Sequence, residues 1–261
     1  MAVLHPAISR QGPMWKCMRI HDTRSRMNTV IARARRVGQP MVSLLLAGWD
    51  RWVSSQSRMR HLPPRLARHL TDIDDVLDVG SGSGQLARLL MQINPALSIT
   101  GVDVKLQPDP GIPVLRYDGV QLPFADNAFD AVTLVDVLHH DRQPERVLQE
   151  ALRVARHRIV IKDHYWVTRW DHVLLCIADY LGNRPYGIAL PYNFLKIEGW
   201  RDLFENAGVR VTRVERFHYS MWDRVKQIIF VLEPATLRHG AAVDPPASPG
   251  VAFVEPHARR S

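Results

Sequence analysis

Residues 76–84, Val76-Leu-Asp-Val-Gly-Ser-Gly-Ser-Gly84, decide the fold of this chain. The apolar residues are typical of a short buried strand, and an acid, Asp78, stands just before three alternating glycines. Glycine lets the chain turn sharply and lets bare backbone N–H groups approach a ligand at the start of the next helix. Residues 85–92 supply that helix, with leucines on one face. The stretch predicts a nucleotide-type cofactor site at the first strand-to-helix turn of an open α/β sheet.

The spacing of the glycines narrows the choice of cofactor. The dinucleotide fingerprint Gly-x-Gly-x-x-Gly would need a glycine where this chain has Gln85. No Gly-Lys-Ser/Thr follows, which excludes a P-loop. Asp78 at the mouth of the turn would repel a pyrophosphate but suits a positively charged cofactor. S-adenosylmethionine carries a sulfonium and an ammonium and no phosphate, so it is the expected cofactor.

Further segments follow in the order of a doubly wound sheet. Residues 98–103 are a second predicted strand, whose terminal acid Asp103 can accept hydrogen bonds from both ribose hydroxyls. A third short strand precedes Asp118, whose carboxylate can accept a hydrogen bond from an adenine amino group. Residues 129–140 are a fourth strand that runs into a turn. All these features belong to one cofactor site along the strand ends.

Over residues 71–233 the chain resembles the class I S-adenosylmethionine-dependent methyltransferases of the type 11 group. The resemblance rests on the glycine loop, on Gly-Val-Asp103, on Asp118 with Leu-Pro-Phe124, and on Phe129-Asp with Leu-His-His140. It implies a Rossmann-like α/β fold, a doubly wound sheet of seven strands with an antiparallel final strand. Many relatives end the next helix with Arg-Val-Leu-Lys-Pro-Gly-Gly. This chain has Arg153-Val-Ala-Arg-His-Arg158, so the turn into strand five is expected to differ.

The resemblance also assigns the cofactor-binding residues. The first strand end and the glycine loop would hold the methionine part, and the second strand end the ribose. The segment after the third strand would hold the adenine, and the end of the fourth strand would line the cofactor. The residues so implied are, in that order, Asp78, Gly80, Ser81, Gly82 and Gly84, then Asp103 and Val104, then Asp118 and Gly119, then Val135 and Asp136.

Charge divides the chain unevenly. Residues 1–70 hold 13 Lys and Arg against 2 Asp and Glu, and the remaining residues hold 21 against 24, which together give the net charge of +8. The catalytic domain is therefore slightly acidic, and a global argument for nucleic-acid binding would mislead. We expect a basic, partly disordered arm over 1–39, N-terminal helices over 40–70, the domain over 71–233 and a disordered tail over 234–261.

The N-terminal helices admit two interpretations. Residues 40–54 are amphipathic and either pack on the core or dock on a membrane surface. Pro63-Pro64 is expected to break the chain before a short helix that ends near Leu70. Apolar runs are shorter than the roughly 20 residues of a membrane span, and no signal-peptide core is present, so a soluble cytoplasmic protein is expected. Two cysteines form no framework, and no Cys/His spacing indicates zinc, so no metal is expected.

An insertion of about residues 164–195 follows strand five. Residues 164–200 contain eight of the twenty aromatic residues, which favours a lid or pocket wall over a plain connector. A helix is expected over 171–179, and Asp179 and Asn183 near its end are expected to form local caps.

Catalytic groups are expected after strands four and five. Methyl transfer from a sulfonium releases a neutral thioether, so positioning supplies much of the catalysis and a base is needed only for a protonated acceptor. His140 is the expected base or acceptor-orienting group, and a helix-start hydrogen-bonding role is its alternative. His139 is expected to point elsewhere. Asp163 and His164 either orient an acceptor hydroxyl or amine, or pin the insertion to the sheet.

The leading functional hypothesis is an S-adenosylmethionine-dependent methyltransferase with a small-molecule, apolar or lipid-like acceptor. A nucleic-acid methyltransferase guided by the basic arm is the first alternative, although the chain has Val-Asp-Val-Leu where amino-methylating enzymes of nucleic acids carry Asn/Asp-Pro-Pro-Tyr/Phe. A non-catalytic cofactor-binding scaffold protein is the second. Peripheral membrane contact through residues 40–54 is a further expectation.

Overall fold

The computed structural model describes residues 56–183, 190–220 and 223–234 of the chain. The predicted arm over 1–39, the amphipathic helix over 40–54 and all but the first residue of the predicted tail lie outside these residues. The domain boundaries proposed for these segments therefore stay predictions. Among the described residues, no helix is long and apolar enough to cross a membrane.

One sheet of seven strands organises the fold, in the order β3-β2-β1-β4-β5-β7-β6. Strands β1 to β5 are parallel to one another, and β7 is antiparallel to both β5 and β6. This arrangement confirms the predicted doubly wound sheet with an antiparallel final strand. The strands are β1 Asp75–Val79, β2 Ser98–Asp103, β3 Val114–Arg116, β4 Phe129–Val135, β5 Ala155–His164, β6 Arg210–Phe217 and β7 Gln227–Glu233.

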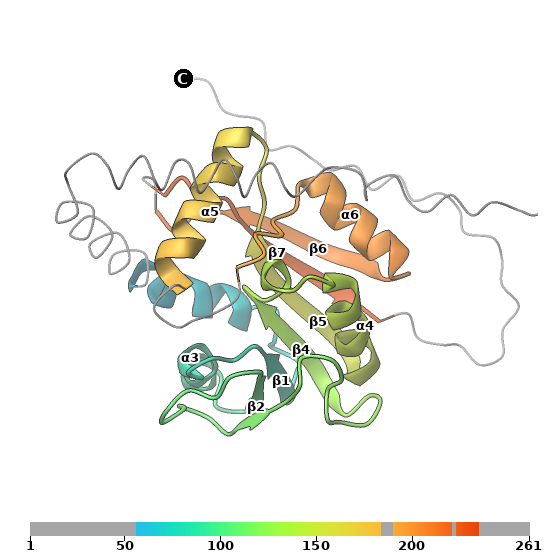
Figure 1. Cartoon of the computed structure of the whole chain (residues 1–261). Helices are drawn as coiled ribbons and strands as arrows, with labels where there is room; N and C mark the ends of the chain where they lie inside the picture. The colour runs from blue at the N-terminus through green and yellow to red at the C-terminus, as the bar shows by residue number, and fades with distance from the viewer. Residues whose placement is uncertain (1–55, 184–189, 221–222, 235–261) are drawn as a thin grey trace, which may run out of the picture.

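Helices cover both faces of the sheet (Figure 1). On one face α4 (Pro144–Val154) and α6 (Ile197–Asn206) pack against the strands through aliphatic side chains and the fully buried Trp200. On the other face α3 (Gln85–Ile93) and a helix over residues 56–67 bury their leucines. Both helix pairs are amphipathic, so burial of their apolar faces positions the sheet.

The helix over residues 56–67 corrects the expected break at Pro63-Pro64, because it runs through both prolines. Each proline removes one backbone donor from the helix. Leu62, Leu66 and Leu70 are nevertheless 0% exposed, and their burial against the sheet holds the segment in place. Tertiary packing has here overridden local propensity.

The order of the strands reverses its direction at β1 and β4. The chain leaves β1 toward β2 and β3 and then returns to β4 on the other side of β1. Ligands of open α/β sheets bind where the direction of winding reverses, beyond the carboxyl ends of such strands. The short 3-10 helix η2 (Leu138–His140) follows β4 there, and α5 (Arg169–Asn183) of the insertion lies beyond the ends of β4 and β5 (Figure 1). The join to strand five is direct, since α4 ends at Val154 and β5 begins at Ala155.

Candidate active site

The glycine loop adopts the sharp turn that the sequence predicts, but its amides are not bare. Gly80 and Ser81 both donate their N–H groups to the Val102 carbonyl, at 2.8 and 3.2 Å. Gly82 donates its N–H to Oδ2 of Asp103 at 2.9 Å, and Gly84 donates to the Ser81 carbonyl. Four of the loop amides are therefore already engaged, and the expectation that free amides at the start of the next helix face a ligand stays a prediction. These donors fasten the loop to β2, which leaves other groups to bind a cofactor.

The glycines have a left-handed backbone and leave space that a side chain would otherwise fill. At Gly80 (φ 73°) a Cβ atom would stand 2.6 Å from Cγ2 of Val137, so the loop packs directly against the residue before η2. At Gly82 (φ 56°) a Cβ atom would meet nothing within 4 Å, which leaves open space beside the backbone. Ser81 between them has a buried hydroxyl with no hydrogen-bond partner. The loop therefore offers a bare backbone surface and one unpaired polar group.

Asp103 ends β2 beside this open space. Oδ2 accepts from Gly82, and Oδ1 accepts from the backbone N–H of Lys105 at 2.9 Å. Each carboxylate oxygen has two lone pairs, so both can accept a second hydrogen bond. The ribose role predicted for Asp103 is compatible with this geometry and stays a prediction.

Asp78 lies deeper than expected. Its side chain is buried at the end of β1, and the Thr133 hydroxyl of β4 donates to its Oδ1 at 2.6 Å. Burial raises the pKa of Asp78 to about 6, and the neighbouring charge of Asp103 adds to this rise. A buried carboxylate of raised pKa is stabilised in its charged form by a nearby cation, and such groups gather at functional sites.

Asp118 and Gly119 lie across from the end of β2. A Cβ atom on Gly119 (φ 78°) would stand 3.1 Å from Cγ1 of Val104, so the two predicted segments meet. Asp118 is exposed, and its Oδ1 accepts from Val120 at 2.7 Å and from Gln121 at 3.0 Å. These backbone donors lower the pKa of Asp118. The carboxylate closes a turn here, and its contact with adenine stays a prediction.

At the end of β4 the sequence analysis missed a buried cation. Val135 is buried, and Asp136 has a left-handed backbone (φ 59°). The Asp136 carboxylate pairs with the buried Lys162 of β5 and, at 3.0 Å, with Arg58. These cations hold the pKa of Asp136 well below its usual range, although burial alone would raise it. Strained backbone of this kind gathers at functional sites.

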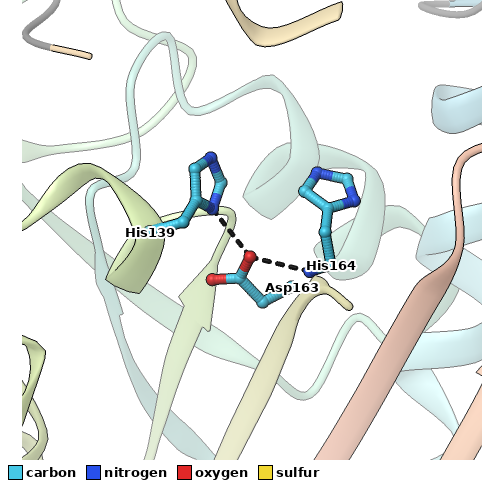
Figure 2. A group of neighbouring side chains, drawn as sticks. All are labelled: His139, Asp163 and His164. Atoms are coloured by element: carbon cyan, nitrogen blue, oxygen red, sulfur yellow. Dashed lines mark hydrogen bonds and ion pairs between the residues drawn. The ribbon is translucent and has the colours of Figure 1, made fainter. Parts of the chain in front are cut away.

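His139, which follows β4, and Asp163 of β5 form a buried pair (Figure 2). Nδ1 of His139 lies 2.7 Å from Oδ1 of Asp163, which also accepts from the backbone N–H of His164 at 2.7 Å. Burial opposes protonation of His139, but the Asp163 carboxylate outweighs it and raises the pKa of His139 to about 10. The expectation that His139 points elsewhere was wrong. Asp163 is 0% exposed, so its carboxylate contacts His139 and is not open to an acceptor.

His140 is the histidine nearest to solvent in this group. Its side chain is 19% exposed, and Nε2 lies 3.6 Å from Oδ1 of Asp179 on α5. Burial lowers the pKa of His140, so the ring is neutral near pH 7 and can accept a proton. Asp179 also lies 3.8 Å from Nε2 of His139 and accepts from Asn183 at 2.6 Å. Local capping therefore describes only part of what Asp179 does. Asp179 lies on the buried face of α5, and an acid at such a position in the sequence could have indicated its contacts with the two histidines.

His164 is held on the other side of the group. Its Nε2 lies 3.3 Å from Oδ1 of Asp136. Burial, with the positive charge of Lys162, lowers the pKa of His164 to about 3, so the ring is neutral. The structure thus brings all three predicted catalytic residues to the ends of β4 and β5.

The aromatic residues of the insertion divide into different roles. Phe194 is buried and stacks on His139 with ring centroids 4.7 Å apart, and the Trp166 indole donates to the Phe194 carbonyl. Trp200 is part of the core, whereas Trp170 is 81% exposed. Tyr186 lies outside the described residues. The contacts of Phe194 place it next to His139 and Trp166, and the lid or pocket wall expected of the insertion stays a prediction.

Comparison with known proteins agrees with this geometry. Residues 77–158 match the family model of the methyltransferase domain. The matched residues include the glycine loop and the strands β2 and β4, with the acids at their carboxyl ends. The protein contains a class I S-adenosylmethionine-dependent methyltransferase domain, and S-adenosylmethionine is the cofactor of that class.

Individual relatives are similar over limited lengths. The chain is 34% identical over 88 residues to demethylmenaquinone methyltransferase of Renibacterium salmoninarum, covering 31% of this chain and 36% of the relative. It is 30% identical over 97 residues to "Probable tRNA methyltransferase 9B" of Mus musculus, covering 36% and 22%. The chain thus spans well under two thirds of these relatives.

A solved structure from Haloferax volcanii shares the fold. It is a complex between the Trm112 methyltransferase activator and a methyltransferase, and it aligns with a TM-score of 0.53. The alignment has 16% identity and covers 75% of this chain and 97% of that one.

Proposed function

We propose that this protein transfers a methyl group from S-adenosylmethionine to a small-molecule acceptor at the carboxyl edge of its sheet. The observation that carries the proposal is the convergence of Asp78, Asp103 and the open backbone at Gly82. Two carboxylates at this loop suit a cationic cofactor better than a phosphate, although the positive charge of Arg58 also reaches Asp78 and lowers its pKa. The cytoplasmic location expected from the sequence is part of the same proposal.

The residues present fit this cofactor. Asp78 would face its positive charge, Asp103 would accept from the ribose hydroxyls, and Gly82 leaves space for close approach. The loop amides are already engaged by β2, and a cofactor without phosphate does not need them. The cofactor supplies an activated methyl group on a sulfonium. The chain's own contribution is to hold the acceptor in line with that group and to exclude water.

The acceptor would lie between the glycine loop and the insertion. Neutral His140 can accept a proton from an acceptor hydroxyl, and Phe194 with Trp166 supplies an apolar wall. A quinone-type acceptor is supported by the similarity to a demethylmenaquinone methyltransferase. An apolar ring with hydroxyl groups matches both the aromatic wall and the histidine.

Cofactor binding is tested by calorimetry on the full chain. Asp103→Ala should weaken S-adenosylmethionine binding by about tenfold or more, since hydrogen bonds to a charged group contribute about 1.5–3 kcal/mol. Asp202→Ala, an exposed acid on α6, is the matched control and should leave affinity unchanged. Equal affinity in the Asp103 variant would refute the ribose role.

The acceptor class is tested with radiolabelled cofactor. Label should pass to reduced demethylquinones or to the lipid fraction of a cell extract, and the His140→Gln variant should slow this transfer. A nucleic-acid acceptor is the second candidate, because one relative carries a tRNA methyltransferase name. It predicts label in RNA and a steep fall of affinity with salt. Cofactor binding without transfer to any fraction would indicate a scaffold protein instead.

A further inference from the structure

Three side chains of ligand type meet under α5 without hydrogen bonds joining them. Nε2 of His139 and Nε2 of His140 lie 3.8 and 3.6 Å from the same oxygen, Oδ1 of Asp179. Both distances exceed the usual length of a hydrogen bond. Two ligands bound to one zinc ion at about 2.1 Å stand about 3.4 Å apart in a tetrahedral site, so the observed separations suit a shared ion.

Burial and charge also favour an ion. The side chains of His139 and Asp179 are 3% and 5% exposed, and Oδ2 of Asp179 is buried without a hydrogen-bond partner. Buried charges in proteins are paired or coordinate metals. Lys162 and Arg58 balance Asp136 in this group. Asp163 already faces Nδ1 of His139, so the ion would take the place of the proton on Nε2 of that ring, and its charge would balance the carboxylate of Asp179.

The surrounding residues orient these ligands. Asp163 binds Nδ1 of His139 at 2.7 Å, and the other nitrogen of that ring lies on the side away from Asp163 (Figure 2). Histidines that bind metal ordinarily give their second N–H to a carboxylate in this way. Asn183 donates to Asp179 at 2.6 Å and fixes that carboxylate as well. We propose that His139, His140 and Asp179 bind one divalent metal ion of the zinc class.

A second grouping, of His139, Asp163 and His164, is a weaker choice. The facing atoms of His139 and Asp163 are already joined by a hydrogen bond, and Oδ1 of Asp163 also accepts from the His164 backbone. Nε2 of His164 faces Asp136 instead. An ion there would have to replace these contacts, whereas the site at Asp179 replaces none between its ligands.

The location of the site indicates its use. His140 is 19% exposed, so the ion would be reached from the side of that ring. Val137, two residues before His139, packs on Gly80 of the cofactor loop. Three protein ligands leave a coordination position for an oxygen donor. Resting on the proposed function, we infer that this donor is a hydroxyl or phenolic oxygen of the acceptor, held beside the methyl group. His140 would then hold the ion instead of accepting the acceptor's proton.

Metal binding can be measured on the full chain after treatment with a chelator. Zn²⁺ is titrated in competition with a chromophoric chelator, and Co²⁺ is added separately to record its visible absorption. The intact chain should bind one more tight Zn²⁺ ion than His140→Gln or Asp179→Asn. Asp163→Asn should lower the affinity for that ion by about 10–100-fold, as loss of an orienting carboxylate does at other metal sites. His157→Gln removes an exposed histidine of β5 and should change nothing.

Two outcomes would overturn the metal site. One is equal Zn²⁺ stoichiometry and affinity in the intact chain and in folded His140 and Asp179 variants. The other is a Co²⁺ spectrum identical to that of the aqueous ion, which needs no variant and so holds even if a variant fails to fold. Calorimetry with S-adenosylmethionine on the same samples separates the two proposals. Cofactor binding without metal binding contradicts the metal site alone, and the reverse result contradicts the methyltransferase proposal alone.

Discussion

Asp78 is an acid placed where burial and function oppose each other. Its folded pKa of about 6 lies above the unfolded value of 3.8, so protonation favours the folded state. The stability that it contributes is complete below the unfolded pKa and is lost as pH rises through the folded pKa, by about 3 kcal/mol. A cation beside the carboxylate would instead favour the ionised form. Stability and cofactor affinity should therefore change in opposite directions with pH.

Asp78→Asn removes the charge of this side chain and keeps its size, so it tests the opposite effects of pH on stability and on cofactor affinity. Above about pH 7 the variant should unfold at higher urea concentration than the parent, since no charge is buried. Its cofactor affinity should be lower there, and it should lose the roughly tenfold decrease in affinity that the parent shows between about pH 7 and pH 5. Denaturation and calorimetry over pH measure both effects. Asp74→Asn, an exposed acid nearby, should behave as the parent. An Asn variant with unaltered pH dependence would contradict the cationic-ligand role.

Among the elements, α4 holds the segment that follows β3. The Arg153 guanidinium donates to the carbonyls of Leu122 and Phe124 and to Asp126 and Glu150, and Glu150 accepts from the N–H of Leu122. One planar group thus fixes the loop that runs on from the proposed adenine site. Lysine cannot reproduce this contact, because its ammonium is a compact point charge.

Arg153→Met should loosen this loop. We expect a loss of about 2 kcal/mol in the free energy of unfolding, from several hydrogen bonds at a partly exposed group. Hydrogen exchange over residues 118–126 should rise more than elsewhere, and Arg153→Lys should be intermediate. Arg142→Met, exposed before the same helix, serves as the control. Uniform exchange in the Arg153 variant would show that α4 does not hold the loop.

Local sequence patterns predicted the helices and strands well, because the formation of a helix or strand depends on residues that are close together in the chain. The glycine loop, the strand-end acids and the amphipathic helices all follow from spacing within about ten residues. The hydrogen bonds of the loop amides could not be predicted in this way, because their acceptors, Val102 and Asp103, belong to another strand. The contact between His140 and Asp179 was missed for the same reason, since it joins residues 39 apart in different elements.

Across the whole molecule, one buried cation joins separate parts of the fold. Lys162 of β5 pairs with Asp136 after β4, and Arg58 from the helix over residues 56–67 pairs with the same carboxylate. The Lys162 ammonium also lies 5.6 Å from the ring of Tyr219, which follows β6. The N-terminal helix and the last strands therefore meet at the end of the central strands.

Lys162→Met should show how much this junction contributes. It leaves Asp136 buried with one partner fewer, and breaking such a pair costs about 3–5 kcal/mol. Asp136→Asn in the same chain removes the carboxylate that both cations contact and keeps a residue type that tolerates a left-handed backbone. Because Arg58 then loses its partner as well, full recovery is not expected, but the loss of the double variant in urea denaturation should be smaller than the sum of the two single losses. Arg210→Met breaks an exposed pair with Glu233 and should cost about 1 kcal/mol or less. Additive losses in the Lys162 and Asp136 variants would mean that the two charges are not coupled, and the junction would then be held by apolar packing alone.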